Sequence, residues 1–289
     1  MPGAGWSCSP LSSFSVKPLR SGSSGNLTLV EHAGTLLLVD AGLPSQRGLS
    51  LALSEAGASW DDVDAVLVSH LHGDHIHPSA VACCARHDVP ILIHEKNVRA
   101  FSRRILSRSP ASGPLRTFGS EPFSVGSIWV QPFPVPHDAE GMTCGFLLRA
   151  RAGNREARVA MATDLGNGGN GLYERFADSD LILIESNYDP AMLAASHRNH
   201  HDRARVDSEV GHLSNEQAGK FLVRAMQESR KPPRAVVLCH LSADHNTPDL
   251  AVATVRGILS RYGYGAIPVH AARRNRPSPR FFAMEAGRE

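Results

Sequence analysis

Short apolar runs bounded by turn residues recur along the whole chain, and this pattern predicts many short strands. Continuous runs such as residues 89–93 and 181–184 are typical of strands that are buried on both faces. Paired runs around a turn predict two hairpins, at residues 27–39 and 145–162. Single strands are predicted at residues 14–19, 65–68, 89–93, 128–135, 181–184, 235–238 and 267–270.

Longer segments with helix start and stop signals lie between these strands. Gly57 is placed to end a helix, Pro78 to begin one, and Ser214 with Gln217 has the form of a capping box. Residues 107–119 contain prolines and glycines and predict a loop. Strands that alternate with helices indicate the α/β class. Helices are predicted at residues 45–56, 78–86, 95–106, 214–229 and 248–260.

No linker or change of composition divides the chain, so we expect one domain over residues 14–270, with terminal extensions at 1–13 and 271–289. Two halves of similar content suggest a two-layered sandwich. The tail with Arg273, Arg274, Arg276 and Arg280 is expected to be a loosely ordered, solvated end. A chain of 289 residues buries roughly 75% of its unfolded surface, which is enough to fold without disulfides.

Charge and cysteine content exclude several classes of protein. The formal net charge of +2 is close to balance and gives no overall argument for nucleic-acid or membrane binding. The five cysteines include no Cys-x-x-Cys pair, which argues against a disulfide framework and against a thiolate zinc site. No charged-then-apolar leader opens the chain, and no apolar run approaches the roughly 20 residues of a membrane span. We therefore expect a cytoplasmic protein that does not bind membranes.

Histidine is the unusual component, because the chain has 15 and they cluster. Three imidazoles and one carboxylate lie between His70 and His75, directly after an apolar run and around a flexible glycine. Packing alone explains such density poorly, because each buried polar group needs a partner. A divalent cation, or a pair of them, is a partner that all four groups can share.

Ionisable residues also follow the predicted strands elsewhere in the chain. Ligand sites of α/β sheets gather outside the carboxyl ends of strands, so we expect these side chains to converge on one site. The residues concerned are Asp40, His70, His137, Asp164, Glu185 and His240.

These motifs resemble the metallo-β-lactamase superfamily. Its His-x-His-x-Asp-His motif is met by His70, His72, Asp74 and His75. The resemblance implies an αββα four-layer sandwich over nearly the whole chain and a hydrolytic centre with two metals. It implies that Asp40 orients a ligand loop or histidine rather than binding metal.

The resemblance also divides the ligands between the two metals. It implies one metal on His70, His72 and His137, a second on Asp74, His75 and His240, and Asp164 with a hydroxide as the bridge. Donors without thiolate suit zinc, manganese or iron. Two such metals about 3.5 Å apart generate hydroxide near neutral pH and stabilise both the attacking and the leaving oxygen.

The second half of the chain narrows the expected substrate. Glu185 at a strand end and His212 in a Gly-His-Leu-Ser motif resemble the phosphodiesterase branch of the superfamily. The resemblance implies that Glu185 orients His212, and that His212 stabilises the phosphate or protonates the leaving oxygen, as poor leaving groups require. The alternative is that His212 only helps to cap the helix after Ser214.

The loops together resemble the YycJ/WalJ group of that superfamily. They include Ser21–Asn26, the Asp40 turn and the Asp164, Glu185, His212 and His240 segments. The resemblance implies a 5′ to 3′ DNA exonuclease with DNA rather than RNA as substrate, in which Asp74 positions or deprotonates the attacking hydroxide. Two alternatives remain open: hydrolysis of a small cyclic phosphodiester, and hydrolysis of a thioester, lactone or β-lactam.

Other polar residues are assigned less specific roles. Residues 196–205 are rich in histidine and arginine, and they are interpreted either as a contact for a nucleic-acid backbone or as a solvated loop. His245 is a candidate for lining the site. The arginines of residues 99–108 are interpreted as an exposed helix face, and His77, His87 and His94 as structural or surface residues.

Overall fold

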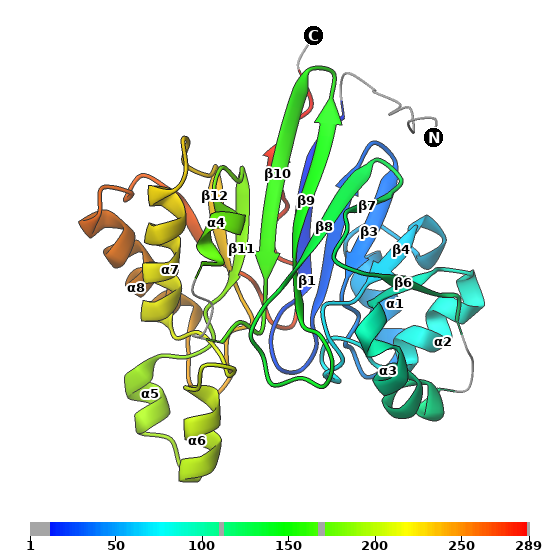
Figure 1. Cartoon of the computed structure of the whole chain (residues 1–289), viewed down its shortest axis with the longest axis horizontal. Coiled ribbons are helices and arrows are strands. Elements are labelled where there is room, and N and C mark those ends of the chain that lie inside the picture. The colour runs from blue at the N-terminus through cyan, green and yellow to red at the C-terminus, as the bar shows by residue number, and fades with distance from the viewer. Residues whose placement is uncertain (1–11, 110–112, 167–170, 288–289) are drawn as a thin grey trace.

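The computed structural model describes residues 12–109, 113–166 and 171–287, in which two mixed sheets of seven strands each pack face to face (Figure 1). In the first sheet the strand order is β14-β1-β2-β3-β4-β5-β6, and in the second it is β13-β12-β11-β10-β9-β8-β7. The first sheet contains β1 (Phe14–Arg20), β2 (Leu27–His32), β3 (Thr35–Val39), β4 (Ala65–Leu67), β5 (Ile91–His94), β6 (Leu115–Phe118) and β14 (Phe281–Met284). The second contains β7 (Phe123–Val125), β8 (Ile128–Pro134), β9 (Cys144–Ala152), β10 (Arg155–Ala162), β11 (Leu181–Glu185), β12 (Ala235–Cys239) and β13 (Val269–Ala271).

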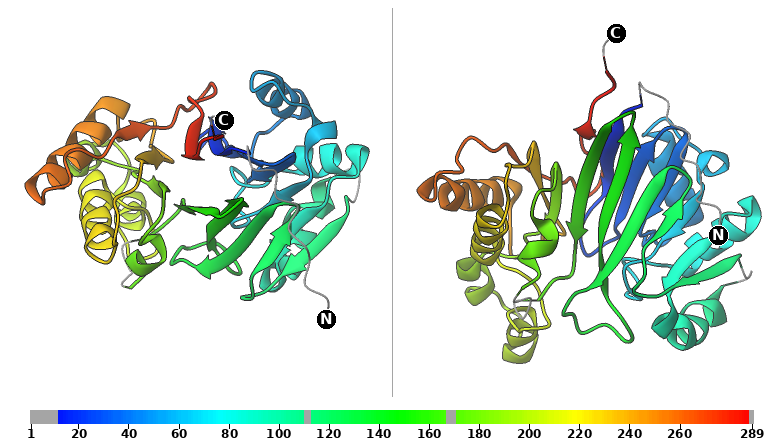
Figure 2. Two further views of the ribbon diagram at one scale, coloured as in Figure 1. Left: turned by 90° about the horizontal axis from the view of Figure 1, so that it is seen from above. Right: turned by 45° about the horizontal axis from the view of Figure 1, so that its top comes forward.

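Helices cover the outer face of each sheet, so the molecule has four layers (Figure 2). The helices beside the first sheet are α1 (Gln46–Ser54), α2 (Pro78–His87) and α3 (Val98–Arg104). Those beside the second are α4 (Tyr173–Phe176), α7 (Asn215–Gln227) and α8 (Pro248–Arg261). A short pair, α5 (Pro190–Ala194) and α6 (His200–Val206), projects below α7 in Figure 1.

Strand alternation explains the layers, because successive side chains of a strand point to opposite faces. In β11, Leu181 and Leu183 pack between the two sheets, whereas Ile182 and Ile184 pack against the helices of the second sheet. Both faces of this strand are therefore apolar, which is why its sequence reads as a continuous apolar run.

The sheet topology places one edge of both sheets at the same end of the sandwich. Strands β3 to β6 are parallel to one another, and so are β10 to β13. Their carboxyl ends lie at the lower end of the sandwich in Figure 1. This common edge is where the predicted polar residues leave their strands.

Most of the predicted strands and helices are present, and the differences are local. The predicted loop at 107–119 contains β6, which extends the parallel part of the first sheet beside β5. The helix predicted at 95–106 is divided into a 3₁₀ turn, Glu95–Asn97, followed by α3. Part of the stretch 196–205, interpreted as a loop or a backbone contact, forms α6 with Asn199 as its N-cap.

The prediction of a loosely ordered tail is wrong for residues 281–284. They form β14, which pairs with β1 at the edge of the first sheet. Phe281 and Met284 are buried there, and burial of apolar area outweighs the entropy of ordering the segment. The domain boundary at residue 270 stays a prediction, and this pairing favours placing it beyond Met284. No helix in the described ranges is long and apolar enough to cross a membrane.

Candidate metal centre

The six strand-end residues converge at the carboxyl edge of the two sheets. Three of them, Asp40, Asp164 and His240, have left-handed backbone with φ of 61°, 55° and 54°. Such values are uncommon outside glycine, and they turn the chain sharply so that the side chain enters the site. Asp40 follows β3, His70 follows β4, His137 follows β8, Asp164 follows β10, Glu185 ends β11 and His240 follows β12.

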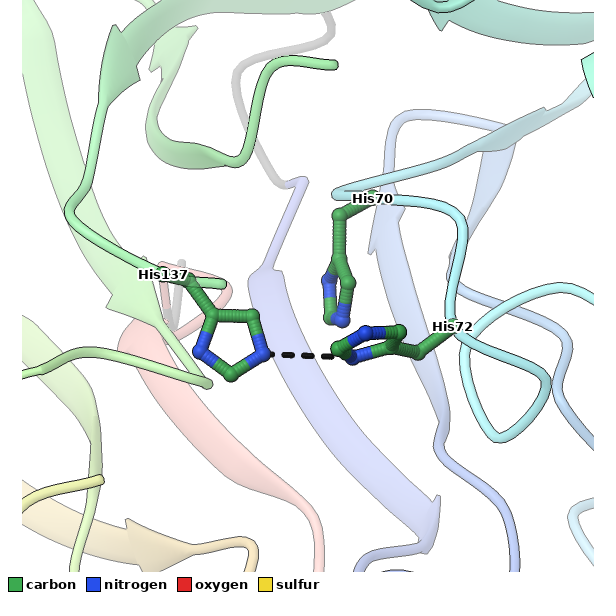
Figure 3. Close-up of side chains that lie close together, drawn as sticks. All are labelled: His70, His72 and His137. Atoms are coloured by element: carbon green, nitrogen blue, oxygen red, sulfur yellow. Dashed lines mark hydrogen bonds between the residues drawn. The ribbon is translucent and has the colours of Figure 1, made fainter. Parts of the chain in front are cut away.

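His70, His72 and His137 form the first cluster, with one nitrogen of each ring within 4.8 Å of the others (Figure 3). His72 Nδ1 lies 3.2 Å from His137 Nε2. His137 Nδ1 is 3.1 Å from the Gly211 carbonyl oxygen, to which it donates, so its Nε2 carries a lone pair. His70 Nε2 is buried and has no hydrogen-bond partner among the described residues. The three rings thus turn lone pairs toward one point.

Asp74, His75 and His240 form the second cluster. Asp74 Oδ2 lies 3.3 Å from His240 Nε2 and 3.7 Å from His75 Nε2. Asp164 stands between the clusters, because its Oδ2 is 2.7 Å from His75 Nε2 while its Oδ1 is 3.5 Å from His137 Nε2. This is the position that a bridging carboxylate requires.

Asp40 contacts the motif loop rather than the interior of either cluster. Its carboxylate accepts hydrogen bonds from the backbone N–H of Ser69 at 2.8 Å and from Ser69 Oγ at 2.9 Å. It also accepts one from His75 Nδ1 at 2.7 Å. That bond holds the proton on Nδ1 and leaves His75 Nε2 as the donor atom, which is the orienting contact that metal-binding histidines require.

Glu185 is fully buried and accepts four hydrogen bonds. Its Oε2 accepts from the backbone N–H groups of Leu165 at 3.0 Å and Leu213 at 3.1 Å. Its Oε1 accepts from Nδ1 of His212 at 2.9 Å and from Nδ1 of His240 at 2.8 Å. Both imidazoles are thereby fixed with Nε2 as the atom left for the site. The pairing with His212 follows the sequence prediction, whereas the bond to His240 was not foreseen.

His212 lies between the two clusters. Its ring centroid is 5.4 Å from that of His137 and 5.4 Å from that of His240. Burial alone would lower the pKa of His212, but the Glu185 charge and hydrogen bond outweigh burial and raise that pKa above its ordinary value. The ring is therefore suited to donating a hydrogen bond from Nε2.

The pKa values of His70 and His72 shift in the opposite direction from that of His240. Burial, together with neighbouring imidazoles, lowers the pKa of His70 well below its ordinary value and that of His72 to about 4, so both rings are neutral. At His240 burial also opposes charging, but Asp164, Asp74 and Glu185 outweigh it and raise its pKa to about 10. The carboxylates thus attract positive charge to the site.

These observations fit the binding of divalent cations. Metal ligation requires deprotonated donors. His70 and His72 are neutral, whereas His240, whose pKa the carboxylates raise to about 10, would release a proton when a metal binds. The buried Nε2 of His70, which has no partner within the described chain, is an atom that a metal would satisfy. The donor set contains no thiolate, because the buried cysteines lie outside these clusters.

Supporting contacts from distant loops were not assigned from the sequence. Asn26 Nδ2 lies 2.9 Å from His75 Nε2 and 3.2 Å from the Asp74 carbonyl oxygen. Ser21 Oγ accepts from the His240 backbone N–H at 2.9 Å. A Cβ at Gly42 would lie 1.8 Å from the Asp74 carbonyl oxygen, so only glycine permits this approach. The polar loop of residues 21–26 and the turn after Asp40 are the sequence signals for these contacts.

Other candidate residues lie outside the centre. His245 is buried and bonds Ser196 Oγ at 2.8 Å, so it holds a loop instead of lining the clusters. The basic residues of 196–205 bond within the protein: Arg198 to Asp244, Arg203 to the Ala194 carbonyl and Arg205 to Asp138. His77 caps α2, His94 bonds the Lys96 N–H and His87 bonds Asp61, as expected of structural or surface residues. Arg103 pairs with Glu140 on an exposed face.

Comparison with known proteins agrees with this geometry. A family model described as the beta-lactamase superfamily domain matches residues 35–240. The exodeoxyribonuclease YycJ of Bacillus anthracis is 31% identical over 260 residues, which cover 87% of this chain and 90% of that protein. The exodeoxyribonuclease WalJ of Streptococcus pneumoniae is 29% identical with the same coverage. The metallo-β-lactamase fold protein YhfI from Bacillus subtilis has a TM-score of 0.67 at 16% identity, covering 94% of this chain and 99% of that one.

The chain belongs to the metallo-β-lactamase superfamily and is a metal-dependent hydrolase. Within that superfamily it is similar to the YycJ and WalJ proteins over most of its length, which confirms the resemblance drawn from the loops. The predicted αββα sandwich is also confirmed, by the layers and by the likeness in fold to YhfI.

Proposed function

We propose that this protein is a dinuclear metal-dependent phosphodiesterase that degrades DNA as a 5′ to 3′ exonuclease in the cytoplasm. The observation that carries the proposal is His212, which Glu185 holds between the two clusters through Nδ1, so that Nε2 is the ring nitrogen left to face the site. A centre whose side chains only bound metal would not require His212 as an additional hydrogen-bond donor. The likeness to two exodeoxyribonucleases over 87% of the chain supports DNA as the substrate.

The ligand assignment follows the two clusters. His70, His72 and His137 would hold one cation, Asp74, His75 and His240 the other, and Asp164 would contact both. Zinc and manganese suit these donors, and iron is a further possibility. Bound there, two cations supply a nucleophilic hydroxide near neutral pH and neutralise charge on the phosphate.

The protein's own residues position and protonate the reactants. The side chain of Asp74 is 23% exposed, whereas that of Asp164 is 3% exposed, so Asp74 is the carboxylate that reaches the substrate side. It accepts a hydrogen bond from the attacking oxygen and directs that oxygen at phosphorus. His212 donates from Nε2 to the phosphate and then to the departing oxygen, which leaves poorly without a proton. The Glu185 carboxylate keeps the Nδ1 proton on the His212 ring throughout.

Metal-supplemented digestion tests the proposal. Purified protein with Mn²⁺ or Zn²⁺ is given end-labelled single- and double-stranded DNA and RNA, a cyclic nucleotide, and thioester and β-lactam substrates. The proposal predicts release of mononucleotides from the 5′ end of DNA, and loss of that release in His212→Ala. Hydrolysis of thioester or β-lactam without any cleavage of phosphodiesters would overturn it, and cleavage confined to the cyclic nucleotide would reassign the substrate.

A further inference from the structure

A recess of about 640 Å³ lies beside the candidate metal centre and is lined by three arginines. The arginines, Arg273, Arg274 and Arg276, come from the loop between β13 and β14. The lining also includes Leu241 and Ser242, which directly follow His240. This loop is part of the segment that was expected to be a solvated tail.

The arginine loop is fixed in place by backbone contacts to both sheets. The Ala272 N–H donates to the Leu238 carbonyl of β12 at 2.8 Å. The Ser278 N–H donates to the Pro18 carbonyl of β1 at 2.8 Å, and Ser278 Oγ accepts from the Arg273 N–H at 2.9 Å. These contacts hold both ends of the loop, so its side chains are presented by an ordered backbone.

Among the described residues, the guanidinium groups of Arg273, Arg274 and Arg276 form no ion pair with a carboxylate, whereas Arg280 of the same loop pairs with Glu31. Arg274 donates to the Leu241 carbonyl at 2.6 Å and Arg273 to the Pro277 carbonyl at 3.3 Å. The Arg276 side chain is exposed, and no hydrogen bond or ion pair to it is present within the described ranges. Asp244, an acidic residue close to Arg274, is paired with Arg198 at 2.7 Å. No carboxylate lines the recess among the described residues, so it carries net positive charge.

The recess adjoins the centre through the loop of residues 21–26. Ser21 lines it and bonds the His240 backbone N–H at 2.9 Å. A Cβ at Gly22 would lie 2.9 Å from Arg274 Nη1, so the loop of residues 21–26 packs between the arginines and the metal motif. β12 and β13 run parallel, and their carboxyl ends therefore lie on the same edge as the catalytic clusters.

We propose that this recess binds a phosphate of the substrate strand next to the phosphate that is cleaved. The inference rests on the proposed function and names the part of the substrate that the arginines recognise. Guanidinium groups suit phosphate because their planar N–H pairs match two of its oxygens. A phosphate held there positions the strand so that the scissile group reaches His212 and Asp74, which improves binding without a contribution to bond cleavage itself.

The test compares a substrate with neighbouring phosphates and one without. Arg273→Gln/Arg276→Gln and the matched control Arg261→Gln are assayed on single-stranded DNA and on bis(p-nitrophenyl) phosphate. Arg261 is exposed at the end of α8, remote from the recess, and its replacement removes the same charge. We expect kcat/KM of the double variant for DNA to fall about tenfold or more through KM. The loss on DNA should exceed the loss on bis(p-nitrophenyl) phosphate at least about tenfold.

Salt dependence gives an independent measurement. Binding of phosphorothioate-protected DNA is followed by fluorescence anisotropy at several salt concentrations. The slope of log K against log salt should decrease by about 0.7 when one phosphate contact to single-stranded DNA is lost. An unchanged slope and KM relative to Arg261→Gln, or equal losses on both substrates, would overturn the recess as a phosphate site. If the wild-type protein cleaves neither substrate, the proposed function fails, and the binding measurement alone then tests whether the recess binds phosphate.

Discussion

Replacing Glu185 by Gln tests whether one buried carboxylate controls both a metal ligand and the proton donor. Glu185 Oε1 accepts from Nδ1 of His212 at 2.9 Å and of His240 at 2.8 Å, and Oε2 accepts two backbone N–H groups. Glutamine has one acceptor oxygen. If that oxygen keeps the backbone N–H groups, the amide NH₂ faces both imidazoles, which must then carry their protons on Nε2.

The consequences of this exchange differ at the two rings. At His240 the proton occupies the atom proposed to bind metal, and loss of such an orienting contact lowers metal affinity about 10- to 100-fold. At His212 the carboxylate that stabilises the charged ring is gone, so the ring is a poorer proton donor. Loss of a general acid slows hydrolysis about 10²- to 10⁴-fold. Hydrogen bonds to a charged group are each worth about 1.5–3 kcal/mol, so the free energy of unfolding falls by about 3 kcal/mol or more.

The assay separates these effects by comparing three variants. Metal content after dialysis against a competing chelator, turnover of labelled DNA and denaturant unfolding are measured for Glu185→Gln, His212→Ala and Glu228→Gln. Glu228 is exposed at the end of α7 and controls for the loss of one carboxylate. We expect His212→Ala to lose turnover and keep its metal, and Glu185→Gln to lose both. Wild-type metal affinity in folded Glu185→Gln would refute the coupling of Glu185 to His240.

Three further outcomes are expected. Asp74→Ala or His72→Ala should abolish hydrolysis, because each removes a proposed metal ligand, while circular dichroism shows a native fold; undiminished turnover in a folded variant would refute the mechanism. In Gly42→Ala the new Cβ would meet the Asp74 carbonyl oxygen at 1.8 Å, so we expect a lower melting temperature by calorimetry and weaker metal retention by metal analysis. Gly257→Ala, where an added Cβ meets nothing within 4 Å, is the comparison. Removal of metal with a chelator should abolish turnover and lower the melting temperature. Addition of Mn²⁺ or Zn²⁺ should restore turnover and the original melting temperature, because a ligand that binds only the folded state stabilises it. A melting temperature that does not change with metal would contradict the two-cluster site.

The clusters could be predicted from sequence because their signals are local. The motif from His70 to His75 is dense, and the other candidates stand immediately after apolar runs, so strand topology alone brings them to one edge. The contact between Glu185 and His240 joins residues far apart in sequence and depends on the register of two parallel strands. Periodicity does not report such register. Asn26 was likewise seen only as part of a polar turn.

The tail was mispredicted for a related physical reason. Its arginines, prolines and glycine give the composition of a solvated end, and four residues of β14 are too few for a clear period. What orders the segment is the unpaired edge of β1, which accepts β14 as a partner. An edge strand exposes backbone N–H and C=O groups, and pairing them, together with burial of Phe281 and Met284, orders a segment that is too short to show a strand period.

The division of the site between the two sheets connects its chemistry to its architecture. The first sheet supplies Asp40 and the motif from His70 to His75, and the second supplies His137, Asp164 and His240. The cluster of His70, His72 and His137 and the cluster of Asp74, His75 and His240 each take residues from both sheets, so a cation bound in either one would join the two sheets at their common edge. In the free protein the carboxylates at this edge are balanced by His75 and His240, whose pKa values they raise against the effect of burial. The same carboxylates would hold metal cations in place of those protons, so metal binding and the packing of the two sheets would stabilise each other.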